Sequence, residues 1–255
     1  MSARSLANGL LSALFEPPCA ACHARLARPL DGAVCDRCWA LVRPITPPVC
    51  CRCGDPLPSW RASSIGERQC PRCRRSAPAV DRLVAVGAYE GSLREIVHAL
   101  KYGGRRTIAP RLAALMRASG ADILSGADLV VPVPLHFRRE WMRGFNQAEE
   151  LARWLGLPLA HALRRTVATT PQVGLPAAQR HRNVRDAFAL ARPSVRGVLA
   201  SRRLRPPTCE GRVIVLVDDV TTTGATLEAC ARVLKRAGAR EVRALTAARV
   251  VTARR

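Results

Sequence analysis

The sequence is poor in aromatic and acidic residues, and it contains no long apolar run. Phe, Trp and Tyr make up 4% of its 255 residues although hydrophobic residues make up 48%, so leucine, valine and alanine must build the core. That apolar fraction excludes a wholly disordered chain. No stretch reaches the ~18 apolar residues that a membrane span requires, and residues 6–15 lack the cleavage site of a secretory signal. We therefore expect a cytoplasmic protein, in which residues 6–15 form a helix that packs on the rest of the chain through Leu6, Leu10, Leu14 and Phe15.

Positive charge is in large excess. Lysine and arginine number 41 against 19 acidic residues, which gives a formal net charge of +22. Such a charge creates a field that favours polyanions or phosphates, although a basic surface that serves only solubility is the alternative. Residues 161–210 hold ten arginines and two acids, and residues 192–205 have the composition of an exposed loop.

Eight of the eleven cysteines form four Cys-x-x-Cys pairs within the first 73 residues. Such a turn places two thiolates at the separation that a tetrahedral Zn²⁺ requires, and two turns complete one site. The sequence therefore predicts two closed zinc sites, which are structural because they leave no open coordination position. The predicted ligands are Cys19, Cys22, Cys35, Cys38, Cys50, Cys53, Cys70 and Cys73.

The order in which the pairs combine is left open by the spacing. Sequential pairing is favoured because each half of the region then repeats one unit, but crossed pairing of the first pair with the third remains an alternative. Disulfides are disfavoured by the odd cysteine count, by the absence of a signal peptide and by the strain of a bridge within one Cys-x-x-Cys pair.

After residue 80 the sequence changes to alternating strands and helices. This alternation predicts an α/β fold with a mostly parallel sheet, and it divides the chain into a cysteine-rich part, 1–80, and an α/β domain, 81–255. The predicted strands are 83–89, 129–133, 213–217 and 242–247, and the predicted helices are 92–100, 109–118, 145–155 and 224–237.

The strand 213–217 leads into the segment richest in functional groups. It delivers Asp218 and Asp219, followed by threonines, Gly224 and a helix. A helix N-terminus offers unpaired N–H groups to a phosphate, and glycine allows close approach of the backbone. The two carboxylates can accept hydrogen bonds from ribose hydroxyls, directly or through Mg²⁺. We therefore predict a sugar-phosphate site, the alternative being a threonine cap without a ligand.

This segment resembles the phosphoribosyl pyrophosphate (PRPP) signature of type I phosphoribosyltransferases, and the wider chain resembles the ComF family of ComFC- and GntX-like proteins. Besides the cysteine pairs, the matching motifs are Lys101-Tyr102-Gly103, Val131-Pro132-Val133-Pro134-Leu135, Arg143-Gly144-Phe145-Asn146-Gln147, Arg180 with Asn183-Val184, and Ala187-Phe188. The resemblance implies a double zinc ribbon followed by a type I phosphoribosyltransferase-like parallel sheet flanked by helices.

The resemblance also assigns roles to residues. It implies that PRPP, with Mg²⁺, is bound by Asp218, Asp219, Thr221, Thr222, Thr223, Gly224, Ala225 and Thr226. It implies a pyrophosphate loop after Pro134 and a flap over residues 169–185. The candidates there are Lys101, Arg138, Arg139, Arg143, Gln172 and Arg180. A solvated basic loop is the alternative for Arg138, Arg139 and Arg143, and a helix cap is the alternative for Lys101.

Two functions follow from the resemblance. The first is a protein of natural transformation that binds PRPP or a nucleotide, contacts DNA, single strands above all, and works with proteins of the competence machinery. The second is an active phosphoribosyltransferase of nucleotide metabolism with an unidentified acceptor. Thr222 stands where several purine enzymes of this fold carry an aspartate as general base, and threonine cannot take up a proton at neutral pH. The sequence therefore leaves catalysis undecided.

Overall fold

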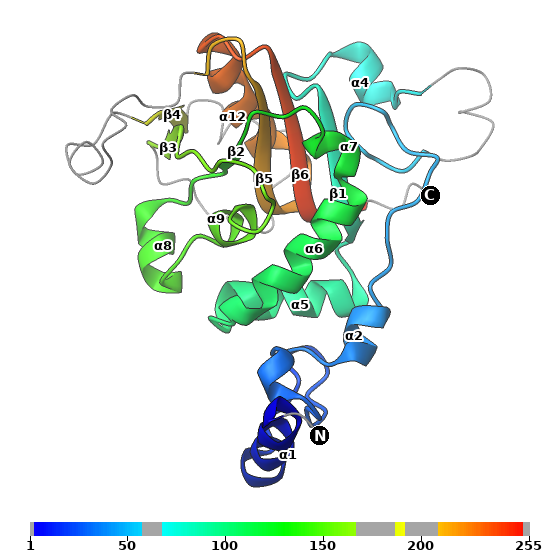
Figure 1. The fold of residues 1–255 in the computed structure, drawn as a ribbon. Helices are drawn as coiled ribbons and strands as arrows, with labels where there is room; N and C mark the ends of the chain where they lie inside the picture. The colour runs from blue at the N-terminus through cyan, green and yellow to red at the C-terminus, as the bar shows by residue number, and fades with distance from the viewer. Residues whose placement is uncertain (1–2, 58–67, 167–186, 192–208, 252–255) are drawn as a thin grey trace.

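The computed structural model describes residues 3–57, 68–166, 187–191 and 209–251 (Figure 1). The predicted flap, with Gln172 and Arg180, and the arginine-rich loop 192–205 lie outside these ranges. None of the helices within the described ranges combines the length and the apolar character needed to cross a membrane.

A parallel sheet of four strands forms the centre of the α/β part, in the order β1-β6-β5-β2. The strands are β1 (Arg82–Ala88), β2 (Leu129–Pro132), β5 (Val213–Thr221) and β6 (Glu241–Arg249). The predicted mostly parallel sheet is confirmed. Strand β5 begins with five buried apolar residues, as expected for a strand that is covered on both faces.

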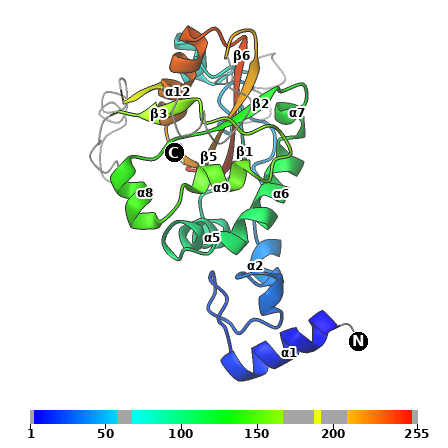
Figure 2. The same cartoon turned by 60° about the vertical axis from the view of Figure 1, so that its left-hand side comes forward.

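Helices cover both faces of the sheet (Figures 1 and 2). On one face lie α5 (Gly91–Tyr102), α6 (Ala109–Ser119) and α9 (Gln147–Ala152), packed on Val215 and Val217 of β5. On the other face, α12 (Ala225–Arg236) and a hairpin of β3 (Leu163–Arg165) and β4 (Phe188–Leu190) pack on Ile214 and Leu216. This follows from the alternation of side chains along a strand. The shorter elements are η1 (Pro29–Asp31), α2 (Asp36–Ala40), α4 (Pro71–Arg75), η2 (Arg106–Ile108), α7 (Ala121–Leu124) and α8 (Phe137–Arg143).

The N-terminal helix α1 (Ala3–Phe15) is where the sequence prediction of packing is wrong. The helix exists, but the four side chains predicted to pack, Leu6, Leu10, Leu14 and Phe15, are 54–72% exposed. Polar side chains dock the helix instead. Asn8 accepts a hydrogen bond from the Leu30 amide at 2.9 Å, and Ser12 donates to the Leu26 carbonyl at 2.9 Å. These bonds turn the polar face of α1 toward the chain and its leucine face outward. Figures 1 and 2 show α1 at the end of the molecule away from the sheet.

The eight paired cysteines form two clusters, and the pairing is sequential. The first cluster is Cys19, Cys22, Cys35 and Cys38, and the second cluster is Cys50, Cys53, Cys70 and Cys73. The favoured sequential pairing is thereby confirmed, and no disulfide joins any of the eleven cysteines.

The spacing of the sulfur atoms fits zinc. The Sγ–Sγ distances are 3.9 Å between Cys19 and Cys38, 3.8 Å between Cys22 and Cys35, and 3.7 Å between Cys53 and Cys70. A tetrahedron with the usual zinc–sulfur bond length has edges of about 3.8 Å. Both clusters therefore have the dimensions of a closed Cys₄ zinc site.

The segment that joins the clusters runs beside the edge strand β1. The Ile45 amide donates to the Val86 carbonyl at 3.1 Å, and the Leu83 amide donates to the Arg52 carbonyl at 2.8 Å. Gly54 makes this approach possible, because a Cβ at that position would lie 2.6 Å from the Leu83 carbonyl oxygen. The second cluster is thus attached directly to the sheet.

The two clusters should each bind one zinc ion independently. We expect about two zinc ions per chain by elemental analysis, and about one in each of the variants Cys22→Ser and Cys53→Ser, because three thiolates hold the metal far more weakly than four. A zinc content near zero in protein from metal-replete cultures would contradict the double-ribbon assignment.

Candidate functional site

The predicted sugar-phosphate segment lies at the carboxyl edge of the sheet. Strand β5 ends at Thr221 and helix α12 begins at Ala225, so the three residues Thr222, Thr223 and Gly224 form the turn between them. Gly224 precedes the helix with φ +79°, a conformation that side-chain-bearing residues rarely adopt. Among the described residues, no atom apart from those of Gly224 and its two neighbours in the chain lies within 4 Å of the place where a Cβ would stand. The backbone at this position is therefore open to a ligand.

Asp219 is paired with a lysine from another helix. The Lys101 ammonium lies 2.9 Å from the Asp219 carboxylate, and the two side chains are only 16% and 11% exposed. Burial opposes the charge of Lys101, but the carboxylates of Asp219 and Asp218 raise its pKa. The end of helix α5 is closed by the Gly103 amide, which donates to the Ala99 carbonyl. The Lys101 side chain thus lies beside the acidic pair, although Lys101 also stands in the last turn of α5, and its contact with a ligand stays a prediction.

Asp218 has a different environment. Its carboxylate accepts the Asp219 amide at 2.9 Å. Burial raises the pKa of Asp218 from 3.8 to about 7, the charge of Asp219 adds to this rise, and the charges of Lys101 and Arg165 oppose it. Arg165, on strand β3, was missed by the sequence analysis, since nothing in its local sequence marks it as a neighbour of Asp218.

The motif 143–147 holds the surroundings of the site in place. Asn146 caps helix α9 by accepting the Ala148 amide at 3.0 Å, and its side chain also donates to the Val133 carbonyl at 3.1 Å. This cap makes α9 begin at Gln147, two residues later than predicted. Arg143 donates to Gln147 at 2.9 Å and lies over the Tyr102 ring, 5.0 Å from its centre. The motif thereby joins the loop after β2 to the residue that follows Lys101.

Other predicted site residues are placed less completely. Arg138 and Arg139 belong to helix α8, in the stretch that follows Pro134, and their side chains lie outside what the structure describes. Gln172 and Arg180 lie outside the described residues altogether.

Two polar groups at the site are suited to a hydroxyl-rich ligand and a cation. The buried Thr221 hydroxyl has no hydrogen-bond partner in the part of the chain that the structure describes. The carboxyl group of Asp218 is held at a raised pKa by burial and by a neighbouring negative charge, and a bound cation would reverse that effect. The carboxylates of Asp218 and Asp219 are therefore the residues that fit Mg²⁺.

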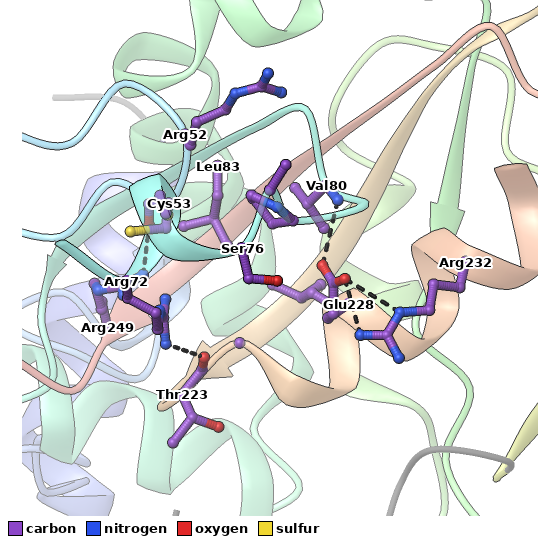
Figure 3. A pocket seen from close by; sticks show the side chains of 15 residues that line it. Arg52, Cys53, Arg72, Ser76, Val80, Leu83, Thr223, Glu228, Arg232 and Arg249 are labelled. Carbon is purple, nitrogen blue, oxygen red and sulfur yellow. Dashed lines mark hydrogen bonds and ion pairs between the residues drawn. The ribbon is translucent and has the colours of Figure 1, made fainter. Parts of the chain in front are cut away.

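The second cluster also contacts the turn at the end of β5. The guanidinium of Arg72, on helix α4, donates to the Thr223 carbonyl at 2.8 Å (Figure 3). A cavity of about 260 Å³ lies beside this contact and is lined by Cys53, Cys73, Thr223 and Gly224, among others. Arg72 stands between two predicted zinc ligands, Cys70 and Cys73, and nothing in its local sequence marks it as a neighbour of the turn.

Comparison with known proteins gives a consistent result. Residues 10–74 match the double zinc ribbon domain, and residues 142–254 match the phosphoribosyl transferase domain. The chain is 30% identical over 238 residues to Competence protein F of Haemophilus influenzae, covering 89% of this chain and 95% of that protein.

Two further relatives cover most of the chain. DNA utilization protein YhgH of Escherichia coli is 35% identical over 207 residues, covering 76% of this chain and 81% of that protein. Competence protein ComFC of Bacillus subtilis is 28% identical over 209 residues, covering 82% of this chain and 80% of that protein. The chain therefore belongs to the ComF family, in which a double zinc ribbon precedes a phosphoribosyltransferase domain.

Proposed function

We propose that the carboxyl edge of β5 binds PRPP together with Mg²⁺, and that the protein acts in the uptake and handling of DNA. One arrangement supports PRPP binding best: the acidic pair Asp218–Asp219 lies next to the open backbone of Gly224 at a helix N-terminus. Within that pair, Asp219 forms an ion pair with Lys101 at 2.9 Å. The names of the relatives, Competence protein F and DNA utilization protein YhgH, support the second part.

Each part of the turn has its own task in this proposal. The amides around Gly224 and the hydroxyls of Thr222, Thr223 and Thr226 bind the 5′-phosphate, because a helix N-terminus carries unpaired donors and a partial positive charge. Asp218 and Asp219 bind the ribose hydroxyls and hold Mg²⁺, whose charge neutralises pyrophosphate when bound. The ion pair with Lys101 holds the Asp219 carboxylate in a fixed position, which preorganises the acceptor before the ligand arrives.

The DNA role is supported by charge and by one exposed aromatic side chain. The net charge of +22 favours a polyanion, although the arginines of residues 161–210, apart from Arg164 and Arg165, lie outside the described residues. Trp141 on helix α8 is 86% exposed and contributes nothing to the core. An exposed indole is a platform on which the bases of a single strand can stack.

Phosphoribosyl transfer to an unidentified acceptor is the second function. Thr222, at the position of the aspartate base of several purine enzymes, cannot take up a proton at neutral pH, so we favour binding over transfer. Release of pyrophosphate from PRPP in the presence of a candidate nucleobase would establish the transferase.

The two acids should respond in opposite ways to neutralisation. Because the pKa of Asp218 is about 7 in the folded protein and 3.8 ordinarily, its contribution to stability falls as the pH rises between these values. We expect Asp218→Asn to raise the free energy of unfolding at pH 8 by on the order of 1 kcal/mol. Asp219→Asn should lower it by about 3 kcal/mol, because Lys101 then stays buried without its partner.

Both variants, Asp218→Asn and Asp219→Asn, should lose their affinity for PRPP. Calorimetry with PRPP and Mg²⁺ measures the affinity, and thermal unfolding at pH 8 measures the stability. Unchanged affinity in both variants would mean that the acids are merely structural. A less stable Asp218→Asn protein would refute the account of its carboxyl group.

Single-stranded DNA should bind in a salt-sensitive way that depends partly on Trp141. We expect Trp141→Ala to weaken binding of a labelled oligonucleotide about tenfold, the effect of removing one stacked base. The slope of affinity against salt should stay unchanged, because no charge is removed. Met142→Ala, which alters the neighbouring 78%-exposed side chain, is the matched control. Fluorescence anisotropy over a salt series measures both quantities, and weak, salt-insensitive binding by the unaltered protein would rule out the DNA role.

A further inference from the structure

The second cluster and the turn after β5 contact each other through polar side chains. We call this contact region the joint, and several of its charged groups already have partners. Figure 3 shows the cavity there. Two of the arginines that line it are neutralised by carboxylates, Arg249 by Asp55 at 3.0 Å and Arg232 by Glu228 at 3.0 Å. Arg72 differs, because its guanidinium donates to a backbone carbonyl of the turn and not to a carboxylate. We therefore interpret these contacts as holding the second cluster against the turn, and not as forming a second ligand site.

We propose that Arg72 is a positioning residue for the phosphate-binding turn, and that the second cluster is thereby a structural part of the sugar-phosphate site. The relevance to PRPP rests on the proposed function, whereas the ordering of the turn by Arg72 does not depend on it.

The position of Arg72 is determined by the cluster. Arg72 lies on α4, a helix of five residues that includes Cys73 and is preceded by Cys70. A helix of this length has no stability of its own in water. The sulfur atoms of Cys70 and Cys73 must therefore hold α4, and with it Arg72, in place beside Thr223, which is 151 residues away in the sequence.

The bond from Arg72 sets the orientation of one peptide group. In a planar trans peptide the carbonyl and the following N–H point in opposite directions. Because Arg72 holds the Thr223 carbonyl toward the second cluster at 2.8 Å, the Gly224 N–H must point away from it. This N–H has no hydrogen-bond partner among the described residues. It belongs to the glycine whose backbone is open to a ligand.

Two further links keep the joint rigid on either side of this bond. Glu228, in the first turn of α12, accepts the Ala79 amide at 2.9 Å and the Val80 amide at 3.4 Å. Arg249, which is 2% exposed and paired in register with Thr221, donates to the Cys53 carbonyl at 2.6 Å. The strand end, the turn and the helix start are each tied to the cysteine-rich part.

The variants Arg72→Met and Arg75→Met test this role. Each variant removes one positive charge from helix α4. Arg75 is exposed and makes no contact with the turn among the described residues, so it is the control. In the ligand-free protein we expect amide hydrogen exchange in residues 221–226 to become about fivefold faster in Arg72→Met, as for the loss of one hydrogen bond. The control should leave exchange unchanged, and Arg72→Lys, which keeps a charged donor, should restore part of the protection.

Calorimetry with PRPP and Mg²⁺ supplies the second measurement, and elemental analysis the third. Affinity should fall about fivefold in Arg72→Met while both variants retain their zinc. Exchange and affinity equal to those of Arg75→Met would overturn the proposal, and so would a change in exchange that occurs only with loss of zinc. If the unaltered protein binds no PRPP, the proposed function fails, and faster exchange in Arg72→Met alone still establishes that Arg72 orders the turn.

Discussion

The structure depends on two adjacent carboxyl groups at the end of one central strand, of which Asp219 is buried and Asp218 is half-buried. Neighbouring residues of a strand point to opposite faces, so Asp218 and Asp219 have different surroundings, although the charge of Lys101 acts on both. Lys101 meets Asp219 at 2.9 Å across one face. Asp218, on the other face, receives one amide hydrogen bond and keeps a raised pKa because burial disfavours its charge. The fold tolerates this arrangement at a cost in stability, as we expect for the proposed ligand site.

The surrounding elements keep these groups in position. Helix α5 supplies Lys101, and the contact of Arg143 with Tyr102 fixes the end of that helix against the motif 143–147. The cap formed by Asn146 connects the same motif to the loop after β2. On the opposite side, the second cluster contacts the turn through Arg72. The second cluster of the cysteine-rich part therefore packs directly against the edge of the sheet that carries the proposed site.

Local patterns in the sequence predicted most of the fold and the acidic turn. The apolar runs predicted the strands, and the Cys-x-x-Cys spacing predicted both clusters, because these features depend on neighbouring residues. Such local patterns could not predict contacts between residues that are far apart in the sequence. Lys101 fitted a helix cap as well as a site contact, and Arg72 and Arg165 carried no signal in their own neighbourhood. The leucines of α1 were predicted to be packed and are exposed, because the bonds of Asn8 and Ser12 decide which face of the helix is turned inward.

The central claim is that the turn between β5 and α12 is a phosphoribosyl site. A crystal structure of the protein with PRPP and Mg²⁺ tests it most directly. The account predicts the 5′-phosphate at the Gly224 amide and the threonine hydroxyls of the turn, with the ribose hydroxyls at Asp218 and Asp219 and the Lys101 side chain still beside Asp219. An empty turn at saturating PRPP, or a ligand bound elsewhere on the molecule, would contradict it.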